Sequence, residues 1–145
     1  MRRPTWSSRP GALGAALSLC FAANASGAEP ARMSAELSCR PEAAPGRVLC
    51  ELKCSVASGS RLAWADALVT HAPTFARPLR SRVTPERFKE ASGAERKLSF
   101  AFVAATSGVG SVTVRARAVV CSGAGERERC RPESQDVTAE LRVGS

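Results

Sequence analysis

Residues 111–143 read SVTVRARAVVCSGAGERERCRPESQDVTAELRV, and apolar side chains alternate with polar ones at both ends of this stretch. Every second residue from Val112 to Val120 is apolar, with threonine and arginine among the residues between them. Residues 137–143 repeat the pattern. Alternation with a period of two is typical of a β-strand that buries one face. The stretch therefore predicts two strands, joined by a glycine-containing, charged loop.

The same alternation continues upstream. Further strands are predicted in residues 35–39, 47–57, 61–70 and 97–106. Residues 71–83 contain two prolines, which cannot donate to a sheet ladder, so an edge strand or loop is expected there. One short helix is expected at residues 85–91. Thr84 can cap this helix, Pro85 suits its first turn, and Gly93 ends it.

These segments make about seven short strands with turn signals between them. Each strand has one polar and one apolar face, which argues against a parallel sheet, whose strands are apolar throughout. The predicted fold is all-β, an antiparallel immunoglobulin-like β-sandwich. The aromatic side chains of Trp64, Phe100 and Phe102 are expected in its core.

The start of the chain predicts export. Three arginines precede an uncharged apolar run, and small residues follow. This is the layout of a secretory signal peptide. Cleavage is expected after Ala25 or Ala28, with Ala28 preferred, which divides the chain into a signal peptide, 1–28, and a single domain, 29–145.

A lipoprotein signal is the alternative for this leader, with Cys20 acylated. No later segment approaches the ~20 apolar residues that a spanning helix needs, so the mature protein is not expected to cross a membrane. We expect it in the periplasm, in the cell envelope or secreted.

The number and distribution of charges do not favour a nucleic-acid ligand. The 145-residue chain has 21 basic and 13 acidic residues, and loss of the three arginines in 1–28 leaves a net charge of +5. The arginines are scattered and tyrosine is absent, whereas nucleic-acid binding uses a basic stripe with stacking aromatics. A solvated basic surface is the simpler interpretation.

Five cysteines remain after residue 28, and pairing is the default in an oxidising compartment. A Cys121–Cys130 disulfide would close a hairpin loop. Cys39 can reach Cys50 or Cys54, with Cys50 slightly preferred. Cys50 and Cys54 lie about 13 Å apart along one strand, too far for a bond to each other. The cysteine left over is a buried thiol or a partner of Cys121 across the sandwich.

Three interpretations of Cys121 and Cys130 compete. A structural disulfide follows from the compartment. A redox pair would need a thiolate stabilised by the nearby Arg127, Arg129 and Arg131; Glu126 and Glu128 would oppose that field. A metal site is not expected, because no second cysteine pair stands at metal spacing and the chain has one histidine.

Two resemblances follow from these residues. Cys50 or Cys54, then Trp64, then Cys121 resemble the cysteine–tryptophan–cysteine order of an immunoglobulin-like sandwich, although Val119 stands where tyrosine is usual. Residues 121–137 are similar to the end of the N-terminal periplasmic domain of thiol:disulfide interchange proteins. In that family a cysteine, a spacer and cysteine-x-proline lead into a strand, which implies a reactive Cys121/Cys130 pair here.

No motif points to catalysis or a cofactor. His71 follows Asp66 in the same strand-like segment, and no G-x-S-x-G elbow occurs. We expect an exported, disulfide-stabilised binding or structural module without catalysis, acting on an unknown envelope or extracellular protein. The alternative is a thiol:disulfide exchange domain that uses Cys121 and Cys130.

Overall fold

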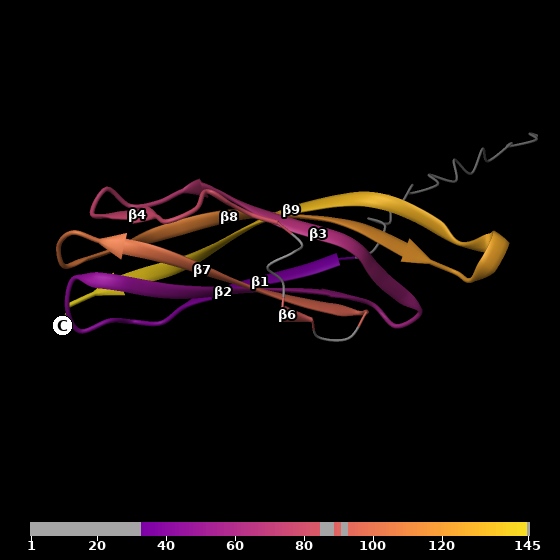
Figure 1. The fold of residues 1–145 in the computed structure, drawn as a ribbon, viewed down its shortest axis with the longest axis horizontal. Coiled ribbons are helices and arrows are strands. Elements are labelled where there is room, and N and C mark those ends of the chain that lie inside the picture. The colour runs from indigo at the N-terminus through magenta and orange to yellow at the C-terminus, as the bar shows by residue number, and fades with distance from the viewer. Residues whose placement is uncertain (1–32, 85–88, 91–92, 145) are drawn as a thin grey trace, which may run out of the picture.

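The computed structural model describes residues 33–84, 89–90 and 93–144, and these residues form two antiparallel sheets (Figure 1). The five-stranded sheet has the order β1-β2-β7-β4, with β6 also paired to β7, and the four-stranded sheet has the order β5-β3-β8-β9. The predicted all-β antiparallel sandwich is therefore confirmed. The strands of the first sheet are β1 (Met33–Cys39), β2 (Gly46–Val56), β4 (Ala76–Pro78), β6 (Lys89–Glu90) and β7 (Glu95–Ala104). Those of the second are β3 (Ser60–His71), β5 (Arg82–Val83), β8 (Gly108–Ser122) and β9 (Arg129–Val143).

The strand order follows that of an immunoglobulin sandwich. Strands β1, β2, β7 and β4 take the places of A, B, E and D, and β3, β8 and β9 take those of C, F and G. The short strands β4 and β5 are edge strands, one in each sheet, on the same side of the sandwich. The β8–β9 hairpin, drawn from orange to yellow in Figure 1, extends beyond the other strands at the end opposite the C-terminus.

The core lies between the sheets and is built from the alternating positions. From the five-stranded sheet, Val48, Leu52, Leu98 and Phe102 are almost completely buried. The four-stranded sheet contributes a similar row along β8, at Val112, Val114, Ala116, Ala118 and Val120. The faces that the alternation assigned to the interior are thus interior in both sheets, and burial of these side chains is the main favourable term that holds the layers together.

The predicted helix at 85–91 is not formed at its described residues. Lys89 and Glu90 form β6, which pairs with Lys97 and Arg96 of β7. Residues 85–88 and 91 lie outside the described part of the chain. Pairing with the free edge of β7 satisfies backbone groups that a two-turn helix would leave partly unpaired at its ends.

Trp64 is not a core residue, which corrects the sequence prediction. The ladder between β3 and β8 shifts register between Leu62 and Trp64, so Ala63 is an extra residue in β3. A β-bulge of this kind moves the following side chains to the opposite face. Leu62 is buried in the core, whereas Trp64 is 37% exposed on the outer face of the sheet.

The last strand begins earlier than the alternation suggested. β9 starts at Arg129 and runs through Pro132. Proline is tolerated here because β9 is an edge strand with β8 on one side only. Early β9 places charged and amide side chains toward the other sheet: Glu133 Oε2 accepts from the Met33 backbone N–H at 2.8 Å, and Gln135 Oε1 accepts from that of Ala35 at 3.1 Å. These bonds cover part of the free edge of β1.

Within the described ranges, we find no helix with the length and apolar character that a membrane span requires.

Candidate functional site

The two cysteines at the far end of the β8–β9 hairpin lie directly opposite each other. Cys121 pairs with Cys130 in the ladder, and a disulfide joins them across Cα atoms 4.0 Å apart. By strand alternation both side chains lie on the outer face of the sheet, away from the core. Cys121 is 2% exposed, whereas Cys130 is exposed. The bond therefore closes the hairpin without linking the two sheets.

The loop that connects these cysteines depends on a glycine. Gly123 has a φ of +89°, and a Cβ at this position would stand 2.8 Å from the backbone oxygen of Arg127. The chain then makes one 3₁₀ turn, η2 (Gly125–Arg127), before β9 begins. A tight, glycine-dependent loop of this kind fixes the two strand ends, and with them the positions of both sulfur atoms.

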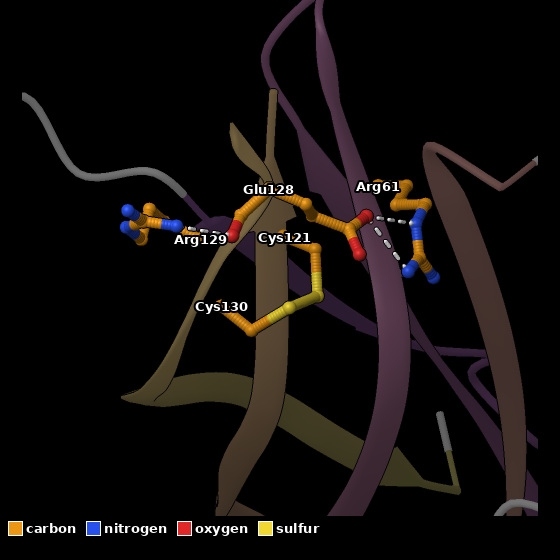
Figure 2. The surroundings of a disulfide bond; sticks show 5 residues. All are labelled: Arg61, Cys121, Glu128, Arg129 and Cys130. Carbon is orange, nitrogen blue, oxygen red and sulfur yellow. Dashed lines mark hydrogen bonds and ion pairs between the residues drawn. A yellow bond between two sulfur atoms is a disulfide. The ribbon is translucent and has the colours of Figure 1, made fainter. Parts of the chain in front are cut away.

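A carboxylate lies beside the disulfide. The sulfur atoms of Cys121 and Cys130 and a carboxylate oxygen of Glu128 are all within 4.8 Å of one another. Figure 2 shows the Glu128 carboxylate between the disulfide and Arg61. Arg61, on β3, donates a hydrogen bond from Nε to Glu128 Oε1 at 2.9 Å, and its Nη2 lies 2.8 Å from the same oxygen. A negative charge this close disfavours a thiolate, and Arg61, the cation across the ladder from Cys121, is already paired.

Two of the three arginines named from the sequence, Arg129 and Arg131, are directed away from the sulfur atoms. Arg129 donates to the backbone oxygens of Glu126 and Glu128, at 3.4 and 3.1 Å, and its guanidinium points away from the disulfide (Figure 2). Strand alternation puts Arg131 on the same side of β9 as Arg129, opposite to Cys130. Sequence reasoning missed Arg61 because its position opposite Cys121 arises from the β3–β8 pairing.

The second disulfide lies on the core face. Cys39 and Cys50 are opposite each other in the β1–β2 ladder, bonded across Cα atoms 3.9 Å apart. Cys54 is opposite Ala35 and stays a free, fully buried thiol. Burial raises the pKa of this thiol to about 11, which makes it a poor nucleophile. In the immunoglobulin arrangement the cysteines of strands B and F bond to each other across the sandwich. Here Cys50 and Cys121, on the corresponding β2 and β8, each bond to the neighbouring strand instead.

An ion cluster on the outer face of the four-stranded sheet was not predicted. Asp66 is completely buried there, beneath the guanidinium groups of two arginines. Arg117 binds both carboxylate oxygens, with Nε 2.8 Å from Oδ1, and Arg82 donates from Nε to Oδ2 at 2.8 Å. These bonds to Asp66 raise the pKa of Arg117. The Arg117 guanidinium also lies 5.9 Å from the centre of the Trp64 ring. The bulge that turns Trp64 outward leaves no sequence signal, so the cluster could not be found from the pattern.

The remaining sequence candidates are separate from this hairpin. His71 is exposed at the end of β3, and Asp66 is held by arginines, so the two form no catalytic pair. Cys20, Ala25 and Ala28 lie outside the described residues.

No protein-family model matches this chain, and no curated protein matches it. Three solved structures are similar to it at low scores. BslA, a bacterial hydrophobin, has a TM-score of 0.35 and 11% identity over 77% of this chain and 96% of its own. AggA, the major subunit of aggregative adherence fimbriae type I from Escherichia coli, has a TM-score of 0.34 and 9% identity over 77% and 95%.

A third structure, of the AAF fimbriae of enteroaggregative Escherichia coli that act in fibronectin binding and biofilm formation, has a TM-score of 0.32 and 9% identity over 76% of this chain and 99% of that one. A likeness at these TM-scores and identities assigns no function to this chain. The resemblance to thiol:disulfide interchange proteins finds no support in these comparisons.

Proposed function

We propose that this chain is an exported module without catalysis, stabilised by two disulfides, which binds a partner or serves as a structural element in the periplasm, in the envelope or outside the cell. Its cysteines act as cross-links between neighbouring strands. The signal peptide at 1–28 delivers the sandwich to an oxidising compartment, where both bonds form and persist.

The observation that carries this proposal is the position of Glu128. Its carboxylate lies within 4.8 Å of both sulfur atoms of the exposed disulfide and pairs with Arg61. A reactive cysteine works through its thiolate, which nearby positive charge stabilises and nearby negative charge opposes. The pairing of Arg61 with Glu128 leaves no net positive field at Cys121 from these two groups, which favours a structural bond.

The reduction potential of the Cys121–Cys130 bond tests this function. A structural disulfide is expected below about −300 mV and should exchange slowly with glutathione in a thiol-trapping assay. Glu128→Gln removes the opposing charge, so it should raise the potential, while Glu126→Gln in the same loop is the matched control and should not. A wild-type potential well above this range, with rapid exchange, would show a redox pair instead.

Thiol:disulfide exchange through Cys121 and Cys130 is the second candidate. The observation in its favour is that Cys130 is exposed at the tip of a hairpin, where a partner thiolate could attack its sulfur. Exchange would proceed by attack of that thiolate on Cys130, release of the Cys121 thiolate and formation of a mixed disulfide.

Export is tested separately by the mass and N-terminal sequence of the protein recovered from the envelope and the medium. A new N-terminus at Glu29 is expected from cleavage after Ala28, or at Ser26 from cleavage after Ala25. A diacylglyceryl group on Cys20 would identify the lipoprotein alternative. An unprocessed chain retained in the cytoplasm would contradict the proposal.

A further inference from the structure

The two outer faces of the sandwich differ in whether their arginines pair with carboxylates. On the four-stranded sheet, Arg117 and Arg82 bind Asp66, and Arg115 donates to Asp136 at 2.7 and 2.9 Å. Near the end of the same strand as Asp136, Arg142 pairs with Glu140 at 2.7 Å. Each of these four arginines is therefore bound to a carboxylate on the same face.

The exposed arginines on or next to the five-stranded sheet differ from these. Among the described residues, no acidic side chain pairs with any of four of them. These are Arg40, Arg47, Arg77 and Arg80. Glu51, on the same face of β2 as Arg47, has Lys97 at 3.7 Å. Guanidinium groups that are left without a carboxylate are available to bind an anion from solution.

Strand register places an apolar strip between these arginines. Val103 of β7 has Arg47 of β2 on one side and Arg77 of β4 on the other. Two residues before Val103 in β7, Ala101 lies opposite Leu49 of β2. The Ala101 carbonyl oxygen accepts a hydrogen bond from the backbone N–H of Leu79 at 2.8 Å. Leu49 and Leu79 are 38% and 49% exposed. We call Arg40, Arg47, Arg77 and Arg80, with the strip Leu49, Leu79, Ala101 and Val103, the basic face.

The basic face is hollowed where β4 ends and the edge of β7 is left open. A cavity of about 300 Å³ is lined there by Arg47, Arg80, Leu79, Ala101 and Phe100, together with Val83 and Ser99. Beside it lies a second hollow of about 270 Å³, lined by Arg40, Leu49 and Ser99 together with Ser38, Cys50 and Glu51. The two hollows share Ser99, and each has at least one arginine and one exposed leucine in its lining.

We propose that the basic face binds a single-chain anionic amphiphile. Arg47 and Arg80 hold its acidic headgroup at the first cavity, and the apolar chain lies against Leu79, Ala101 and Phe100. Forked guanidinium donors match the geometry of a phosphate or carboxylate, and the exposed leucines favour a ligand with an apolar part over a purely polar anion. The cavity is at the small end of ligand pockets, which suits one chain. Among the described residues, no aromatic ring is exposed on this face for a sugar to stack on.

This inference deepens the proposed binding function, and it is tested independently of the disulfide and of export. The processed protein is titrated by calorimetry, below the critical micelle concentration, with lauroyl lysophosphatidylglycerol. Lauroyl lysophosphatidylcholine, inorganic phosphate and poly-L-glutamate are titrated in parallel. The anionic lysolipid should bind about tenfold or more tightly than the zwitterionic one, and added salt should weaken its binding.

Paired variants locate the site. The double variant Arg47→Gln/Arg80→Gln should weaken binding of the anionic lysolipid about tenfold, and Leu79→Ala should weaken it without changing the salt dependence. The matched control is Arg115→Gln/Arg142→Gln on the opposite face, which removes the same net charge and should leave binding unchanged. All three sets replace exposed side chains, and circular dichroism shows whether each stays folded.

Three results would overturn the inference. Equal weakening by the control pair would mean that net charge alone attracts the lipid. Inorganic phosphate that binds as tightly as the lysolipid would mean that the apolar chain has no part. Poly-L-glutamate that binds more tightly would identify an acidic polymer as the ligand.

Discussion

Cys54 is buried on the core face of β2 without a cysteine opposite it. Burial raises its pKa from 9.0 to about 11. Between these values the folded protein keeps a proton that the unfolded chain has lost. The contribution of this thiol to stability is therefore complete below pH 9 and falls as the pH rises toward about 11.

We expect a loss that approaches about 3 kcal/mol across that interval. The measurement is urea unfolding at about pH 8 and about pH 10.5 in the wild type and in Cys54→Ala, which lacks the titrating group and serves as the control. The wild type should lose more stability than the variant. Parallel losses in the two proteins would show that Cys54 titrates normally.

Asp66 is the buried charge of the outer cluster, and its two arginines are unequal partners. Arg117 reaches both carboxylate oxygens, whereas Arg82 reaches only Oδ2. Arg117→Ala should therefore lower the urea midpoint more than Arg82→Ala. Asp66→Asn should cost about 2 kcal/mol, because an amide cannot accept all of the donors that face it. Equal effects of the two arginine variants would contradict this assignment.

At the scale of elements, β1 is an edge strand, and side chains of β9 cover two of its outward N–H groups. Glu133 accepts from Met33, and Gln135 accepts from Ala35. Edge strands with free donors invite pairing with other chains. These two side chains therefore protect the edge as well as joining the two sheets at this side.

Hydrogen exchange tests that role. Gln135→Ala should speed exchange of the Ala35 amide about fivefold, and Glu133→Ala should do the same for Met33, since a bond to the side chain contributes about 1 kcal/mol. Glu140→Ala, on the outer face of the same strand, should leave both amides unchanged. Unaltered exchange at Ala35 in Gln135→Ala would mean that solvent or another group already satisfies this donor.

The whole molecule is a small sandwich that depends on its two cross-links. In the chain-entropy model, Cys39–Cys50 and Cys121–Cys130 contribute about 2.8 and 2.7 kcal/mol. Together they are comparable to the ~5–15 kcal/mol total stability of a typical domain. Variants with one pair replaced by alanines should stay folded at a lower urea midpoint, and removal of both pairs should leave the chain largely unfolded at about 37 °C.

Far-UV circular dichroism during urea unfolding checks this prediction, and wild-type protein held oxidised throughout is the reference. A chain with all four cysteines replaced that keeps the wild-type midpoint would show that packing alone holds the sandwich.

The sequence by itself determined the all-β class, the inward faces of β2, β7 and β8, and the presence of disulfides. Each depends on local information: a period of two indicates which face is buried, and cysteines behind a predicted signal peptide are expected to pair. The tertiary structure decided which groups meet between strands. An extra residue at Ala63 turns Trp64 out of the core. The pairing of β3 with β8 brings Arg61, and with it Glu128, to the hairpin cysteines. Arg47 and Arg80 border the open edge of β7. Register and bulges depend on the sum of contacts along whole strands, so no single segment encodes them.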